Sequence, residues 1–279
     1  MEGWVTRMAK HRYLRFYTLI ILSIFMSLTM LGSPLKASQG ALVDILGVAQ
    51  GTVTLNYSLD QTQKVKVMVE KNGKSLYYNL KDREGTESFP LQMGSGTYTV
   101  AVLENVSGNQ YRYLAKETVD LAGEDALGVY LQSVQLVKWE DNDPVIQKAR
   151  ELTKELKSDS DKLAAIYGYV VDTYRYDYSK LGKLPADYIP NINITESTRT
   201  GICYDFAAVL ASMLRSVDIP AKLVKGYGDA IDGYHAWNEV YIEGKWKPID
   251  TSYDIQMKEH AQKYAMFKDP GKYDKVSEF

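Results

Sequence analysis

Three short segments in the last third of the chain carry the residue types of a thiol nucleophile and its base. Cys203 opens an apolar-periodic segment, His235 lies in the run Tyr234–Glu239, and Asp250 ends the run Trp246–Asp250. Cysteine, histidine and aspartate in this order are the parts of a nucleophile, a general base and the group that orients the base. Cys203 is the only cysteine and His235 is one of three histidines, so this candidate site has almost no rivals in the sequence.

Each of these residues also has a structural interpretation. A lone cysteine is commonly a small buried hydrophobe, His235 could be a hydrogen-bonded core histidine, and Asp250 could be a turn acid. A Cys-His-Asp metal site is disfavoured, because none of the short paired spacings of zinc sites occurs here. No calcium-loop pattern of acids is present either. We therefore expect no metal and no other cofactor.

A helix is predicted to begin near Cys203 and to end at Asp218–Pro220, where proline stops it. Thr200 is the expected cap, which places Cys203 in the first turn. There the free backbone N–H groups and the positive end of the helix dipole stabilise a thiolate, while Asp205 nearby acts against it. The expected buried face is apolar at helical spacing: Phe206, Ala207, Leu210, Ala211, Leu214 and Val217.

Three strands are predicted after this helix, over Ala221–Gly228, Tyr234–Ile242 and Trp246–Asp250. The turn at Glu243–Gly244 would pair Ile242 with Lys245 across the last two strands. In that register Asp250 is the diagonal neighbour of His235 on the same face, close enough for the side chains to touch. A turn one residue longer would place Asp250 on the other face, so the triad interpretation predicts the register.

Two helices are expected before the cysteine. The first begins at Asp143-Pro144, a capping acid followed by proline, and the second follows the polar run Lys157–Asp161. A bridge over Val129–Trp139 is expected to be extended. Residues 177–200 are expected to form a long polar connection, which inside a domain is often functional.

The first 122 residues give two further expectations. Residues 45–122 contain about six short alternating strands and no helical period, which indicates a small immunoglobulin-like β-sandwich acting as a binding module or as a spacer. Residues 1–37 have the basic, apolar and then small-residue order of a secretory signal peptide. An uncleaved membrane anchor is the alternative for this segment, although its apolar run of about 16 residues is short for a span.

The net charge limits the partners that fit this chain. The formal charge is −2 for the whole sequence, and about −6 without residues 1–37, which hold five basic residues and one acidic residue. Nucleic acid is therefore not an expected partner, since it requires a clustered basic face. Contact with a membrane is expected only through the N-terminal segment, if that segment is not cleaved.

The segments described above resemble the transglutaminase-like superfamily of cysteine enzymes, in its bacterial exported branch. The matching pieces are Gly201-Ile202-Cys203, His235-Ala236-Trp237 and Trp246–Asp250, within a resemblance that covers roughly residues 125–260. Membership implies an α+β fold with a papain-like core, in which a cysteine-bearing helix packs on an antiparallel sheet. It also implies that the domain occupies residues 125–279, after the β-sandwich.

The resemblance implies a role for each residue of the triad. Cys203 would attack an amide or ester carbonyl, His235 would pass a proton to the departing amine, and Asp250 would orient the imidazole ring. The backbone N–H of Cys203 is the natural first donor to the oxyanion. Tyr188 and Asn193 lie in the segment where a second donor is expected.

The resulting prediction is an exported thiol enzyme that hydrolyses or crosslinks protein or cell-wall peptides at the cell envelope. Water resolves the acyl-enzyme in hydrolysis, and a primary amine resolves it in crosslinking. One alternative is a catalytically silent surface module that binds peptide or glycan. Another is a structural envelope protein in which the β-sandwich supplies the function. The sequence does not choose between hydrolysis and crosslinking.

Overall fold

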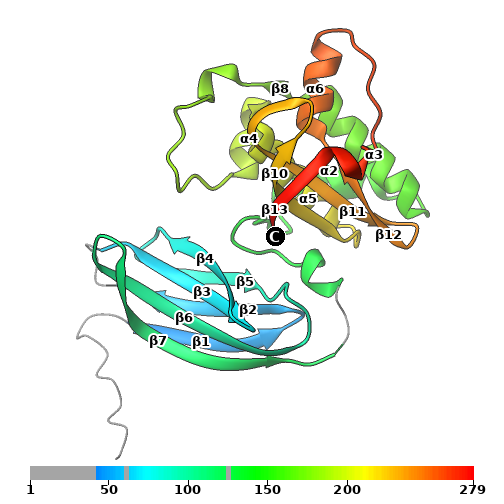
Figure 1. Cartoon of the computed structure of the whole chain (residues 1–279). Helices are drawn as coiled ribbons and strands as arrows, with labels where there is room; N and C mark the ends of the chain where they lie inside the picture. Colours follow the sequence, from blue (N-terminus) through cyan, green and yellow to red (C-terminus); the bar gives the residue numbers. More distant parts are fainter. Residues whose placement is uncertain (1–41, 60–62, 124–126) are drawn as a thin grey trace, which may run out of the picture. The chain divides into compact units, whose positions relative to one another are not determined.

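The computed structural model describes residues 42–59, 63–123 and 127–279 (Figure 1), which all lie in the unit Gly40–Phe279. The predicted signal peptide, residues 1–37, lies outside these ranges. Within them, no helix combines the length and the apolar character that crossing a membrane requires.

Seven strands in two antiparallel sheets make up the first part. Their order is β1-β2-β5 in one sheet and β4-β3-β6-β7 in the other. The strands are β1 (Leu42–Ala49), β2 (Thr52–Ser58), β3 (Val65–Lys71), β4 (Lys74–Leu80), β5 (Glu84–Pro90), β6 (Gly96–Ser107) and β7 (Gln110–Leu121).

Both sheets contribute side chains to one apolar core, which includes Val53 and Phe89 from the first sheet and Val67 and Val100 from the second. The alternation in the sequence therefore predicted the all-β character correctly. About six strands were predicted, and this part of the described chain has seven. The immunoglobulin-like type remains a prediction.

The second part of the described chain contains five α-helices and three 3₁₀ turns. It also contains two short strands in addition to the four-stranded sheet described below. The helices are α2 (Pro144–Thr153), α3 (Asp159–Thr173), α4 (Ile192–Thr198), α5 (Cys203–Arg215) and α6 (Thr251–Glu259). The 3₁₀ turns are η1 (Gly128–Leu131), η2 (Tyr178–Lys180) and η3 (Pro270–Lys272), and the short strands are β8 (Arg175–Tyr176) and β9 (Thr200–Gly201).

An antiparallel sheet with the order β12-β11-β10-β13 carries these helices. Its strands are β10 (Ala221–Gly228), β11 (Ile231–Ile242), β12 (Lys245–Ile249) and β13 (Tyr273–Glu278). The predicted register is confirmed, since Ile242 pairs with Lys245 and the ladder continues to Asn238 opposite Ile249.

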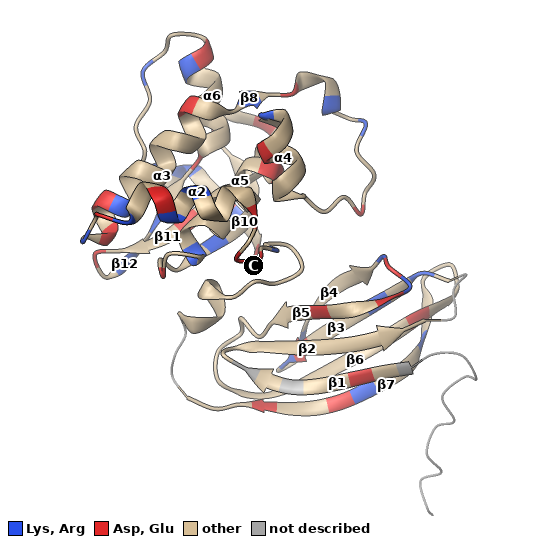
Figure 2. Cartoon of the chain, turned by 180° about the vertical axis from the view of Figure 1, so that it is seen from behind, with Lys and Arg blue, Asp and Glu red and all other residues tan. Residues whose placement is uncertain are grey.

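Helix α5 is the centre of the hydrophobic core. It contacts β10 and β11 on one side, and α2, α3, α4 and α6 pack around its other sides (Figure 1). Phe206, Leu210 and Leu214 are fully buried in the same cluster as Leu223 and Val240 of the sheet. Basic and acidic residues are interspersed along the helices and strands (Figure 2).

Several expectations about loops were wrong. The bridge predicted to be extended begins with the 3₁₀ turn η1, and the connection 177–200 contains η2 and α4. Helix α4 starts where the Asn191 side chain accepts the backbone N–H groups of Asn193 and Ile194, a favoured cap.

Candidate active site

Cys203 occupies the first residue of α5 and is partly exposed. At this position the backbone N–H has no acceptor within its own helix. The predicted cap was wrong: Ile202 is the N-cap residue, and Thr200 lies in strand β9. The thiol is nevertheless in the first turn of the helix, as the periodicity indicated.

Asp205 fixes the start of this helix. Its fully buried carboxylate accepts the N–H of Ile202 at 2.9 Å and a hydrogen bond from the Tyr188 hydroxyl, and it pairs with Lys180 at 3.3 Å. The Lys180 ammonium offsets the negative charge that the sequence placed beside the thiol, and the other two partners stabilise that charge by hydrogen bonding. Asp205, which was expected to oppose a thiolate, therefore anchors the first turn of α5 from a buried position.

Gly201 allows the close packing of this turn. A β-carbon at this position would lie 2.8 Å from the Asp205 β-carbon and 3.1 Å from the Phe206 ring. The first contact is shorter than real β-carbons make and the second is unusually tight, so a side chain two places before the cysteine would force Asp205 or Phe206 to shift.

His235 lies in β11, directly opposite Gly226 of β10, and is 5% exposed. Its Nε2 atom is 2.8 Å from Oδ2 of Asp250. Its ring stacks on Trp237, with centroids 6.4 Å apart. The fixed ring and the buried acid give His235 a defined orientation.

Asp250 follows the last residue of β12 and is the N-cap of α6. Its Oδ1 accepts the backbone N–H of Tyr253 at 2.9 Å, and its Oδ2 accepts the Tyr273 hydroxyl at 3.0 Å in addition to contacting His235. The carboxylate is fully buried. One acid therefore caps a helix and orients the histidine.

The surroundings of His235 keep its ring protonated. Burial by itself would lower the pKa, but the hydrogen bond to Asp250 and the nearby side chain of Cys203 raise it to about 10. The sequence-predicted residues Cys203, His235 and Asp250 are therefore close enough to act on one another's charge.

Tyr273 is the residue of this site that sequence reasoning missed. It starts β13, whose pairing with β10 brings the hydroxyl to Asp250. Its ring also packs on Trp237, with centroids 5.0 Å apart. The sequence Tyr273–Glu278 has no alternation of polar and apolar residues that would have indicated a strand there.

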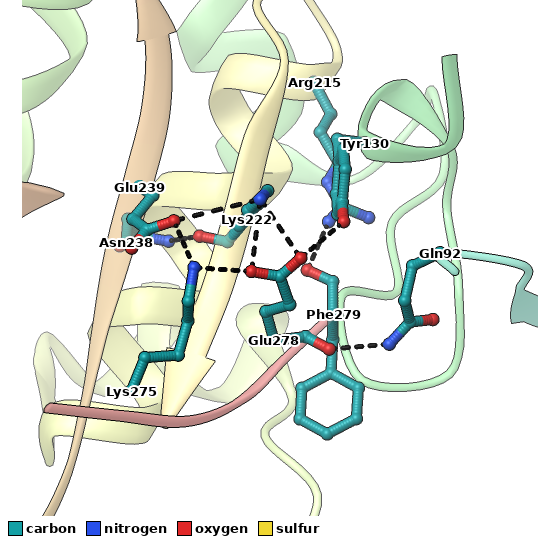
Figure 3. A network of polar contacts seen from close by, with 9 residues as sticks. All are labelled: Gln92, Tyr130, Arg215, Lys222, Asn238, Glu239, Lys275, Glu278 and Phe279. Carbon is teal, nitrogen blue, oxygen red and sulfur yellow. Dashed lines mark hydrogen bonds and ion pairs between the residues drawn. The ribbon is translucent and has the colours of Figure 1, made fainter. Parts of the chain in front are cut away.

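A polar network that is partly exposed at Lys275 holds the other end of β13 (Figure 3). The Arg215 side chain donates to the carbonyl oxygen of Phe279 at 2.9 Å. Lys222 contacts both carboxylate oxygens of Glu278 at 3.1 Å, and Lys275 joins Glu278 to Glu239. This strand is thereby attached along its length to the sheet that carries His235.

The two residues considered as second oxyanion donors have other partners. The hydroxyl of Tyr188 donates to Asp205, and the Asn193 amide donates to Asp143 at 2.7 Å. Tyr176 is a better candidate. It pairs with Gly201 in the β8–β9 ladder, and burial together with the charges of Cys203 and Asp250 raises its pKa.

Trp237, Trp246 and Asn238 have structural roles. Trp237 is 1% exposed, and Trp246 packs edge-on against Tyr130 and Tyr241. The Asn238 amide donates to the carbonyl oxygens of Ala207 and Lys222 and so ties α5 to the sheet. Across the described ranges, no cluster of three or more His, Cys, Asp and Glu side chains is arranged to hold a metal ion.

A cysteine at the start of a helix, packed on an antiparallel sheet with an acid-paired histidine, defines a papain-like class of fold. Residues 146–251 match the model of the transglutaminase-like superfamily. The chain carries a domain of this superfamily, as the resemblance in the sequence indicated.

Two solved structures and one curated protein illustrate the similarity. Human kyphoscoliosis peptidase is 23% identical over 150 residues, which is 50% of this chain and 22% of that protein. A candidate cysteine protease from Cytophaga hutchinsonii is 15% identical with a TM-score of 0.45, over 87% of this chain and 72% of the other. The periplasmic domain of TgpA from Pseudomonas aeruginosa is 16% identical with a TM-score of 0.39, over 79% and 75%. The chain thus spans about a fifth of the human peptidase.

Proposed function

We propose that this protein is a thiol enzyme that attacks amide or ester carbonyls through Cys203, His235 and Asp250. The observation that carries the proposal is the 2.8 Å contact between His235 Nε2 and Asp250 Oδ2 beside a cysteine at a helix start. With Nε2 directed at the acid, Nδ1 is the ring nitrogen left for the thiol. The raised pKa of His235 favours an imidazolium–thiolate pair.

The reaction begins when the Cys203 sulfur attacks the carbonyl carbon and the carbonyl oxygen becomes an oxyanion. The backbone N–H of Cys203 is placed to donate to this oxygen, and the Tyr176 hydroxyl is our candidate for a second donor. The imidazolium of His235 then protonates the departing amine or alcohol. The product of this half-reaction is a thioester on Cys203, and Asp250 holds the ring throughout.

The thioester has two possible fates, and we propose hydrolysis as the first to test. A water molecule, deprotonated by His235, would release the acid and regenerate the thiol. The name of the human relative, a peptidase, supports this choice. Attack by a primary amine, which would give an amide crosslink, is the second fate.

We further propose that the substrate is a protein or cell-wall peptide outside the cytoplasm. The basic and apolar order of residues 1–37 supports export. A single cysteine is compatible with an oxidising compartment, because it has no internal partner with which to form a disulfide.

Acylation by 4-nitrophenyl acetate, a small activated ester, tests the enzyme proposal and does not require the natural substrate. We expect a burst of nitrophenolate and a mass increase of one acetyl group at Cys203, both absent from Cys203→Ser and strongly slowed in His235→Ala. Adding methylamine then compares hydrolysis with transfer, by the ratio of acetate to N-methylacetamide. Nitrophenolate released equally by the wild type and Cys203→Ser would refute the proposal and leave a binding module.

A further inference from the structure

Lys225, in strand β10, has no acidic partner near the candidate active site. The residues opposite it are Ala236 on β11 and Ser277 on β13, and neither is acidic. Among the residues that the structure describes, no carboxylate oxygen lies within the 4.0 Å of an ion pair from its ammonium group. The side chain is half-buried, so water cannot fully replace the missing counter-charge.

Aromatic rings hold this ammonium group in place. Its Nζ lies 3.6 Å from the centroid of the Tyr204 ring and 5.6 Å from that of Phe279. Tyr204 directly follows Cys203 in α5. A cation–π contact attracts the ammonium without neutralising its charge. The cation therefore stays available to bind an anion beside the first turn of α5, which carries Cys203.

Two glutamates of the neighbouring strands are already paired with other lysines. Glu239 of β11 and Glu278 of β13 both contact Lys222 and Lys275 (Figure 3). Burial lowers the pKa of Lys225 to about 8, and the charge of Cys203 acts in the opposite direction. The group whose charge acts on this lysine is thus the candidate nucleophile itself.

We propose that Lys225 is a specificity residue that binds a carboxylate of the acyl donor next to the carbonyl attacked by Cys203. This inference rests on the proposed function. A half-buried cation without a counter-ion gains a charge-assisted hydrogen bond when such a carboxylate enters. The substrate class is therefore an amide or ester flanked by an acidic side chain or a free carboxyl group.

Iodoacetate and iodoacetamide, which differ in carrying a carboxylate or its neutral amide, test this inference on the full chain. The readout is the ratio of their alkylation rates at Cys203 at pH 7. We expect Lys225→Met to lower the iodoacetate-to-iodoacetamide ratio about tenfold, the effect of losing one charge-assisted hydrogen bond. Lys225→Arg keeps the charge and should keep the ratio. The matched control is Lys245→Gln, an exposed lysine at the β11–β12 turn, which should also leave it unchanged.

Two results would overturn the inference. An unchanged ratio in Lys225→Met would show that the ammonium does not meet the anionic reagent. An equal loss of both rates would show that Lys225 acts on the thiolate and not on the ligand. The proposed function is judged separately, by whether the neutral reagent iodoacetamide reacts faster in the wild type than in His235→Ala.

Discussion

His235 and Asp250 meet at 2.8 Å beyond the last pair of the ladder that joins their two strands. The ladder between β11 and β12 ends at Asn238 opposite Ile249, and Asp250 already caps α6. Asp250 is thus held both by the end of strand β12 and by the start of helix α6. A carboxylate held in this way has little freedom to turn away from the histidine, which suits an orienting group.

Replacing Asp250 with asparagine should nearly abolish activity. The amide cannot hold a protonated imidazole as the carboxylate does, so the pKa of His235 should fall and the acylation rate should drop by ~10³–10⁴. The rate is measured as nitrophenolate release, and the pKa by NMR titration of the His235 ring. Asp274→Asn, at an exposed acid of β13, is the control for loss of negative charge and should behave as the wild type.

Replacing Tyr273 with phenylalanine should lower the stability of the protein and loosen the orientation of the Asp250 carboxylate. The variant loses the 3.0 Å hydrogen bond to Asp250, and we expect the free energy of unfolding to fall by about 1.5–3 kcal/mol, the usual range for a hydrogen bond to a charged group. Denaturant unfolding measures this change. Tyr227→Phe, at an exposed tyrosine of β10, is the matched control. Equal stability of the two variants would contradict a supporting role for Tyr273.

Gly226 should not tolerate even alanine. A β-carbon there would lie 2.0 Å from the carbonyl oxygen of Asp274 and 2.9 Å from the Trp237 ring. We expect Gly226→Ala to push β13 away from the sheet and to carry Tyr273 away from Asp250. Amide hydrogen exchange over Tyr273–Glu278 should become faster, whereas Gly168→Ala in α3, where the backbone is helical and a β-carbon meets nothing within 4 Å, should leave that exchange unaltered.

The contribution of His235 to stability should depend on pH in a defined direction. Its folded pKa of about 10 lies above the ordinary value of about 6.5, so the folded state binds the proton more tightly. The stabilisation is complete below about pH 6.5 and is lost as the pH rises through about 10. The Cys203→Ser background removes the second titrating partner. In that background, the stability difference from a variant that also carries His235→Gln should shrink from pH 7 to pH 10, and a constant difference would contradict the assignment.

The cysteine helix and the three-strand register could be predicted because local signals define them. Helical periodicity from Phe206 to Val217 identified α5, and the two-residue turn Glu243–Gly244 identified the pairing of Ile242 with Lys245. The cap of α5 could not be identified in this way. Ile202 has no capping side chain, and the hydrogen bond that satisfies its N–H comes from Asp205 three residues later.

The rest of the site depends on contacts that have no local pattern. Helix α6 buries Thr251, Ser252 and Asp254, so its inward face is largely polar and has no apolar period. Strand β13 is short and follows a polar stretch, and its pairing with β10 spans about fifty residues of sequence. The role of Tyr273 is a consequence of that long-range pairing and could not be read from its neighbours.

Activation of Cys203 by His235 can be measured as the rate at which iodoacetamide modifies Cys203 across pH 4–9. We expect rapid alkylation well below pH 8 in the wild-type protein and loss of this reactivity in His235→Ala. A wild-type rate that rises with pH like that of an ordinary thiol, and that the substitution leaves unchanged, would show that His235 does not activate the cysteine.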